Sequence, residues 1–231
     1  MAFTTLKKIV SPKGIAQYPK LSTPDEYMGT VAYKCNLILD PSEEGVTDFI
    51  EEVEMAVQAS FAATKAELNE KLETAKGKQI ASIQSTLDNL KPHNPCEDEY
   101  ADDGSLTGRV IFKYKRKAEG VYASGRNEGK SWTHTLPIFD ANKKPLPQNS
   151  DKIGMGSILR LQAEILPFSM PSNNIAGISL RLFAVQVIEL SGSGGANADG
   201  FDVEEGGYAA PDAADLSSTE ADSSEDDSAD F

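Results

Sequence analysis

Alternating apolar and polar positions divide the chain into β-strands and one long helical insertion. Over residues 31–39 apolar side chains occupy every second position, which is the period of a strand. Over residues 49–72 they recur at spacings of four or seven and form one stripe, which is typical of an amphipathic helix. A second, weaker helical pattern covers residues 80–90. The sequence therefore predicts a strand followed by a helical insertion at about 42–92.

The period of two returns after this insertion. It predicts further strands at 109–117, 130–138, 157–166 and 175–190, with a turn or short strand at 120–126. Residues 1–28 contain three prolines, and we expect an irregular arm with one short strand at 6–10. Residues 91–104 are rich in turn-forming residues.

Short strands with turn-rich connections and a helical insertion indicate a mainly β protein, α+β by content. A small Greek-key barrel or a sandwich fits this order of elements. The five-stranded oligonucleotide/oligosaccharide-binding barrel, or OB-fold, matches best. We therefore expect an OB-fold domain at 1–190 that carries the helical insertion.

The segment 191–231 has a different composition. It opens with a run of Ser, Gly and Ala, and it contains twelve acidic residues and no Lys or Arg. So little apolar surface does not offset the entropy of ordering the chain, which predicts a disordered acidic tail. Solubility would explain the acids alone, but the aromatic Phe231 favours an interaction tail. Its candidate partner-binding residues are Glu225, Asp226, Asp227, Asp230 and Phe231.

Charge is unevenly distributed along the 231 residues. The formal net charge is −14, and the tail together with residues 40–103 holds 28 of the 36 acidic residues. The remainder of the chain is therefore basic, and it offers an anion-binding surface that the whole-chain charge conceals.

Cations and aromatic residues concentrate at 109–132. The cations are Arg109, Lys113, Lys115, Arg116, Lys117, Arg126 and Lys130, and the aromatic residues are Phe112, Tyr114, Tyr122 and Trp132. Lys and Arg on one strand face follow a phosphate backbone, and aromatic rings stack on bases with little regard to sequence. Phe112 fits the core better than a stacking role, and Trp132 fits either. A solvated strand face over core aromatics is the alternative interpretation of the whole segment.

Three residues outside this segment complete the candidate DNA-binding set. Phe168 lies in a predicted loop, and Lys7 and Lys34 lie on the N-terminal arm and the first long strand.

Catalytic and metal-binding patterns are weak. Two histidines and two cysteines, Cys35 and Cys96, are too few and too scattered for a zinc site or a Ser–His–acid arrangement. We therefore expect no enzyme activity, no metal and no cofactor. Two cysteines also make no disulfide framework, which favours a reducing cytosol. The N-terminus has no secretory signal pattern, and no apolar stretch is long enough to span a membrane.

Four segments together resemble the single-stranded DNA-binding proteins of short-tailed bacteriophages, the gene 2.5 protein type. They are AYKCNLIL before a long helix, VIFKYK, ILPF before the final strand, and the acidic C-terminus ending in Asp230-Phe231. The resemblance implies an OB-fold with a helix between early strands, and a tail that binds replication proteins and competes with DNA. By position, the family's groove lysine corresponds to Lys113, and its next aromatic corresponds to Tyr114 or Lys115. A later tyrosine of the family corresponds to Phe168, while an arginine near Gly29-Thr30 has no equivalent.

The charge and aromatic patterns predict a sequence-tolerant single-stranded DNA-binding protein, and the resemblance implies that it protects and organises DNA in phage replication and recombination. Its expected partners are single-stranded DNA and, through the tail, replication proteins such as DNA polymerase and helicase/primase. The expected location is the cytoplasm of the infected bacterial host, and a homodimer stays open. Two alternatives also stay open: an acidic nucleic-acid mimic that occupies a partner's basic surface, and an RNA-binding OB-fold protein.

Overall fold

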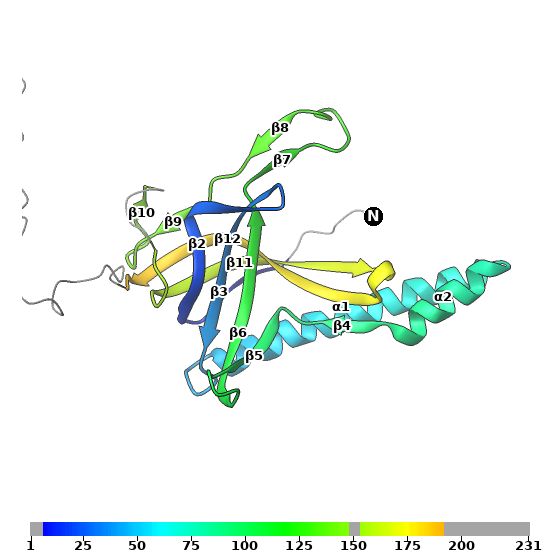
Figure 1. Cartoon of the computed structure of the whole chain (residues 1–231), viewed down its shortest axis with the longest axis horizontal. Coiled ribbons are helices and arrows are strands. Elements are labelled where there is room, and N and C mark those ends of the chain that lie inside the picture. The colour runs from blue at the N-terminus through cyan, green and yellow to red at the C-terminus, as the bar shows by residue number, and fades with distance from the viewer. Residues whose placement is uncertain (1–6, 148–152, 192–231) are drawn as a thin grey trace, which may run out of the picture. The chain divides into compact units, whose positions relative to one another are not determined.

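A computed structural model describes residues 7–147 and 153–191, and within them it shows twelve strands and two α-helices (Figure 1). The long strands are β2 (Gly14–Tyr27), β3 (Thr30–Leu39), β6 (Leu106–Lys117), β11 (Ile158–Met170) and β12 (Ile175–Glu189). The short strands are β1 (Lys8–Val10), β4 (Lys91–His93), β5 (Cys96–Tyr100), β7 (Glu119–Val121), β8 (Ser131–Thr133), β9 (Ile138–Phe139) and β10 (Pro145–Leu146). The helices are α1 (Val46–Thr74) and α2 (Lys78–Asn89).

The five long strands close into a barrel. They pair in the order β2–β3–β6–β12–β11, and β11 pairs again with β2. All of these pairings are antiparallel except β6–β12, which is parallel and joins only Tyr114 with Leu180 and Lys115 with Arg181. This closed barrel, with helices inserted between β3 and β6, confirms the predicted OB-fold.

The core fills the barrel from alternate positions of its strands. Cys35 and Leu37 of β3 are buried beside their neighbours Tyr114 and Phe112 of β6. Helix α1 contributes an apolar stripe to the same core, and its Phe49 ring meets the Phe112 ring edge-on at 5.1 Å between centroids. The sequence-predicted strand at 31–39 and the long helix are therefore confirmed, and their apolar faces meet.

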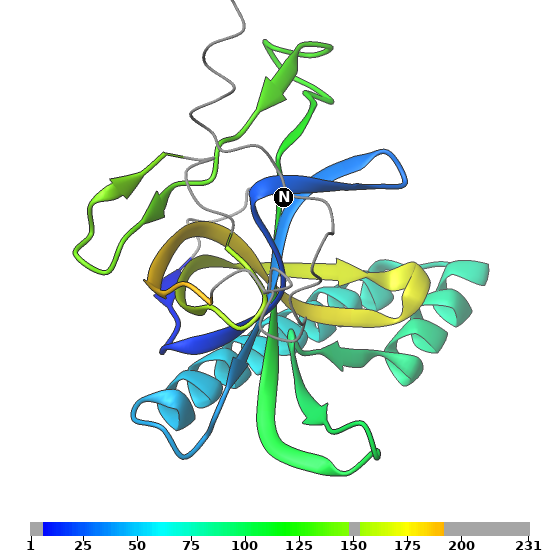
Figure 2. The same ribbon diagram turned by 60° about the vertical axis from the view of Figure 1, so that its left-hand side comes forward.

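The second half of α1 packs with α2 rather than with the barrel interior. Leu68 of α1 and Leu90 after α2 form a small cluster with Ala176 of β12. The Ser60 hydroxyl of α1 donates a hydrogen bond of 2.7 Å to the carbonyl of Gly177, which also ties α1 to β12. Strand β4 then runs parallel to β12 over residues 175–177. In both views the helices lie on the side of the barrel away from the β7–β8 ribbon (Figures 1 and 2).

The N-terminal arm is the main departure from the predicted fold. Residues 14–27 form the barrel strand β2 in spite of Pro19 and Pro24. The pairing with β3 shifts register between Gln17 and Lys20 and again between Lys20 and Asp25, so each proline falls within an irregularity of the ladder. Proline is tolerated there because it has no N–H to donate to a ladder. These shifts also interrupt the period of two that would have shown the strand.

Two further segments differ from the sequence prediction. The strand expected at 130–138 is divided into β8 and β9, and Pro137 lies between them. The turn-rich segment 91–104 contains β4 and β5. The strands expected at 109–117, 157–166 and 175–190 are confirmed with shifted ends.

The predicted tail lies almost wholly outside the residues that the structure describes. Of the disordered tail expected at 191–231, only Ser191 is described. Neither described helix combines the length and apolarity needed to cross a bilayer.

We predict that Gly177→Ala destabilises the protein by about 3 kcal/mol. A Cβ at this position would collide with the backbone carbonyl of His93 on the paired strand β4, and backbone cannot rotate away. Urea unfolding followed by circular dichroism measures the change. Gly154→Ala is the control, because a Cβ there meets its nearest atom at 3.8 Å, and its stability should stay within about 0.5 kcal/mol of the parent. Equal stability of the two variants would contradict this account of the β4–β12 contact.

Candidate nucleic-acid interface

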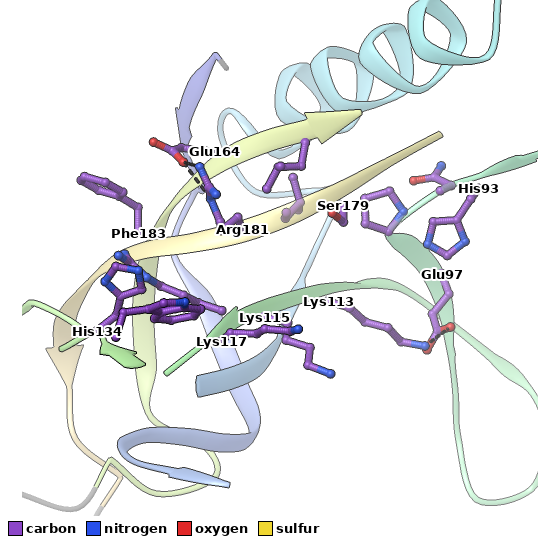
Figure 3. A pocket seen from close by; sticks show the side chains of 16 residues that line it. His93, Glu97, Lys113, Lys115, Lys117, His134, Glu164, Ser179, Arg181 and Phe183 are labelled. Carbon is purple, nitrogen blue, oxygen red and sulfur yellow. Dashed lines mark hydrogen bonds and ion pairs between the residues drawn. The ribbon is translucent and has the colours of Figure 1, made fainter. Parts of the chain in front are cut away.

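A groove opens on the outside of the barrel where β6 and β12 separate. These strands pair over only two residues, and the β4–β5 connection crosses the space beyond that pairing. The groove has a volume of about 950 Å³. We call it the β6–β12 groove, and its lining residues are His93, Asn94, Pro95, Glu97, Lys113, Lys115, Arg116, Lys117, Trp132, His134, Glu164, Leu166, Ser179, Leu180, Arg181 and Phe183 (Figure 3).

Four cations occupy paired positions on four adjacent barrel strands. Lys20 of β2 pairs with Lys34 of β3, Lys34 pairs with Lys115 of β6, and Lys115 pairs with Arg181 of β12. We call these four residues the cation row. Like charges directly opposite each other destabilise a sheet. The cation row therefore destabilises the folded barrel. Binding of an anionic ligand would relieve this repulsion, so the row is suited to an anion-binding surface.

Carboxylates compensate part of this charge. Glu97 holds the Lys113 ammonium at 2.6 Å, and Glu164 accepts a hydrogen bond of 2.9 Å from Nε of Arg181. Asp25 forms an ion pair with Lys34, and the bond with Lys34 lowers the pKa of this carboxyl group. Within the described part of the chain, Lys115 and Lys117 form no ion pair, so their charges are available to a ligand.

Aromatic side chains close one end of the groove. Trp132 of β8 pairs with Gly120 of β7, and a Cβ on Gly120 would lie 2.6 Å from the indole Cζ2. The indole therefore lies directly on the glycine backbone. The His134 ring packs beside it, with 4.7 Å between ring centroids. The two rings stand at the groove as an aromatic pair carried by the β7–β8 ribbon.

The surroundings of His134 favour its neutral form. Burial lowers the pKa of His134 below its ordinary value, and the nearby charges of Arg116 and Arg181 lower it further. The imidazole is therefore uncharged at neutral pH and presents a ring rather than a cation. Phe183 is less available, because Lys8 lies 3.8 Å from its ring centroid and the Arg116 guanidinium lies 5.7 Å from it.

His93 lies at the other end of the groove, and Phe168 supports it. The two rings meet edge-on at 5.2 Å between centroids. Phe168 belongs to β11, opposite Gly177, and is half-buried. The prediction of a loop position for Phe168 is therefore wrong, since β11 continues through Met170.

Five of the predicted DNA-binding residues line the groove, and Tyr114 does not. Lys113, Lys115, Arg116 and Lys117 of β6 and Trp132 of β8 are brought together as expected (Figure 3). Tyr114 is only 2% exposed, because it shares the inward face of β6 with Phe112, and burial raises the pKa of its hydroxyl group. A side chain in the core cannot stack on a base. The prediction that Tyr114 contacts DNA is therefore wrong.

The other predicted residues lie outside the groove lining. Lys34 belongs to the cation row beside it. Arg109 forms an ion pair of 2.6 Å with Glu99, and Lys7 forms one of 2.7 Å with Glu52 of α1. Three residues belong to the β7–β8 ribbon and its loop, namely Tyr122, Arg126 and Lys130.

Sequence reasoning missed four groove residues, which lie on β12, at the end of β4 and directly after β8. Arg181, Phe183, His93 and His134 line the groove but were not among the predicted DNA-binding residues. A signal existed for Arg181, which is a lone cation in the apolar strand ISLRLFAVQVIEL. An arginine on the outward face of such a strand indicates a surface that can bind an anion.

The described residues contain no arrangement suited to metal binding or thiol chemistry. No group of three or more His, Cys, Asp or Glu side chains there is placed to hold a metal ion. Burial raises the pKa of Cys35 to about 12 and that of Cys96 to about 11, so both thiols stay protonated at neutral pH.

Comparison with known proteins agrees with this geometry. The family described as "Single-stranded DNA-binding protein, Bacteriophage T7" matches residues 10–190. The single-stranded DNA-binding protein of Enterobacteria phage T3 is 27% identical over 184 residues, which cover 77% of this chain and 71% of that protein. The crystal structure of gp2.5, a single-stranded DNA-binding protein encoded by bacteriophage T7, superposes with a TM-score of 0.63 and 22% identity. It covers 89% of this chain and 100% of that chain, and it shows the same fold.

The family match includes all five barrel strands, from β2 to the end of β12, and the T7 structure shares that barrel. The chain therefore belongs to the family of the bacteriophage T7 single-stranded DNA-binding protein, a family of DNA-binding proteins and not of enzymes.

Proposed function

We propose that the protein binds single-stranded DNA in the β6–β12 groove. The observation that carries this proposal is the union, in one groove, of ion-pair-free lysines with the rings of the half-buried Trp132 and the exposed His134. Lys115 and Lys117 contact phosphates, and Trp132 and His134 stack on bases. Stacking needs bases that are free of a duplex, and every base has a face to stack, so binding favours single strands and tolerates sequence.

Arg181 has a second task in this proposal. It is paired with Lys115 on the neighbouring strand, and its side chain is held by Glu164 (Figure 3). Its hydrogen bond with that carboxylate fixes the position of the guanidinium at the groove. A phosphate bound there would contact the Arg181 guanidinium as well as the Lys115 ammonium.

We also infer that the acidic segment 191–231 competes with DNA for this groove. Its twelve carboxylates are opposite in charge to the groove, and it follows directly on β12, which forms one groove wall. DNA then displaces the segment and releases it to replication proteins such as DNA polymerase and helicase/primase. The protein would thereby protect single-stranded DNA during phage replication and recombination in the cytoplasm of the infected bacterial host.

We predict that Trp132→Ala weakens oligo-dT binding by about 5- to 150-fold, the equivalent of about 1–3 kcal/mol for one lost stack. Fluorescence anisotropy with labelled oligo-dT measures the change. Trp132 is the single tryptophan of the chain, so the intrinsic fluorescence of the parent protein should also fall on saturation with DNA.

Tyr100→Ala is the matched control for this variant. Tyr100 is 63% exposed on β5 and does not line the groove, so its removal should leave oligo-dT binding unchanged. If Trp132→Ala binds as the parent does and the fluorescence does not respond to DNA, the groove is not the DNA site.

We predict that Lys115→Gln and Lys117→Gln each reduce the salt dependence of binding. Each neutralised phosphate contributes about 0.7 to the slope of log K against log salt concentration for single strands, and each substitution should remove about that amount. Titrations at several salt concentrations give the slope. Lys71→Gln is the control, because Lys71 lies on α1 in an ion pair of 2.7 Å with Glu67. An unchanged slope in both groove variants would contradict their assignment to phosphate.

We predict that a chain ending at Ser191 binds oligo-dT more tightly than the full chain. The difference should be several-fold at low salt and should shrink as salt screens the competing charges. A gel shift across salt concentrations measures it. Loss of DNA binding on truncation would favour the nucleic-acid mimic instead, and preference for oligo-U over oligo-dT in competition would favour an RNA-binding role.

A further inference from the structure

Tyr18 is an exposed aromatic residue on a strained backbone. Its φ is 49°, in the left-handed region that a residue with a bulky side chain seldom adopts, and its side chain is 66% exposed. Tyr27 and Tyr100 are equally exposed but do not have a positive φ. Among the described aromatic residues, Tyr18 alone combines exposure with this backbone conformation.

A β-bulge produces this conformation. The ladder between β2 and β3 pairs Gln17 with Asn36 and then Lys20 with Lys34. Three steps along β2 thus face two steps along β3, which is the signature of one extra residue in β2. Bulges re-aim side chains and are found next to functional sites. Backbone strain of this kind persists where the surrounding structure enforces it.

Both sides of the bulge are held in place. The Asn36 amide donates a hydrogen bond of 3.2 Å to the side-chain oxygen of Gln17, immediately before Tyr18. On the other side, Asp25 binds Lys34 and lies close enough to Lys20 for both lysines to lower its pKa, Lys34 by the larger amount. The bulge is therefore a fixed feature of the outer barrel face.

The cation row leads from the groove to this bulge. Arg181 and Lys115 line the groove, while Lys34 and Lys20 continue the row over β3 to β2, two residues after Tyr18. Neighbouring strands are about 4.8 Å apart, so the row extends about 10 Å beyond Lys115. A phosphate backbone that leaves the groove along this row arrives beside an exposed ring.

We propose that Tyr18 is a second base-stacking site, at which single-stranded DNA that leaves the β6–β12 groove along Lys34 and Lys20 places a base on the tyrosine ring. The inference rests on the proposed function, because the groove supplies the first part of the DNA path. The bulge presents the ring, and the two lysines hold the phosphates that bring the base to it. The ligand at this site is a nucleobase of the same DNA strand.

Oligo-dT of graded length, from about 4 to about 16 nucleotides, tests the site. Tyr18→Ala should leave binding of the shortest oligonucleotides unchanged and weaken binding of the longest by about 5- to 150-fold. Tyr18→Phe keeps the ring and should bind every length as the parent does. Oligo-dT carrying 5-iodouracil should crosslink to Tyr18 only when it is long enough to leave the groove.

Tyr18→Gly separates the stacking role from a folding role. Glycine adopts a positive φ without steric cost, so this variant should unfold at a urea concentration no lower than the parent's and yet lose the same affinity for long oligonucleotides. A variant that unfolds earlier and binds long oligo-dT normally would assign Tyr18 to the fold and overturn the proposal.

Trp132→Ala, measured with the same oligonucleotides, distinguishes the two proposals. If it weakens binding at every length while Tyr18→Ala weakens none, the groove binds DNA and the Tyr18 site is wrong. If Trp132→Ala weakens none, the groove assignment fails whatever Tyr18 does.

Discussion

The short parallel pairing of β6 with β12 is the contact on which both the barrel and its groove depend. It joins two residue pairs, Tyr114 with Leu180 and Lys115 with Arg181, and so closes the five long strands into a barrel. The first pair points into the core, where Tyr114 and Leu180 are buried. The second pair points outward and lines the groove. The pair that stabilises the core and the pair proposed to bind DNA are therefore neighbours, one residue apart on each strand.

The electrostatics of the outer face follow from that geometry. Closing the barrel in this register places Lys115 and Arg181 side by side, and the antiparallel strands beyond add Lys34 and Lys20. Carboxylates on neighbouring strands relieve the repulsion in part, and each of them is also a local substitute for a phosphate. In the proposed site, DNA phosphates would compete with these carboxylates for the same cations, which would moderate the affinity and allow the DNA to be released.

Periodicity made the middle of the fold predictable from the sequence. The strand at 31–39, the helical insertion and the strand β11 each keep one period over many residues, because one face of each is buried against the core. The last strand β12 changes phase at its register shifts, but it is apolar enough over its length to be recognised. The strand β2 was missed because bulges and prolines break its period. The same alternation that assigned Phe112 to the core also assigns Tyr114 to the core. Tyr114 was predicted to stack on bases because cations lie beside it in the sequence, and the alternation was the better guide.

The candidate site was predictable only where it is local in sequence. Four groove cations lie within Lys113–Lys117 and could be recognised as a cluster. Arg181, His93 and Lys20 come from distant segments, and their approach depends on strand register. Register between strands far apart in the chain is decided by packing and closure of the whole barrel, which no local pattern records.

The β7–β8 ribbon forms a hydrogen-bonded sheet of its own, separate from the barrel sheet. The Trp132 indole packs on Gly120 of the same ribbon. The ribbon itself therefore positions the ring that faces the groove. Substitutions on this ribbon can therefore alter how strongly DNA is held while the ladder that keeps the barrel folded stays intact. The ribbon can therefore vary in sequence, and with it the affinity proposed for the groove, without cost to the barrel core.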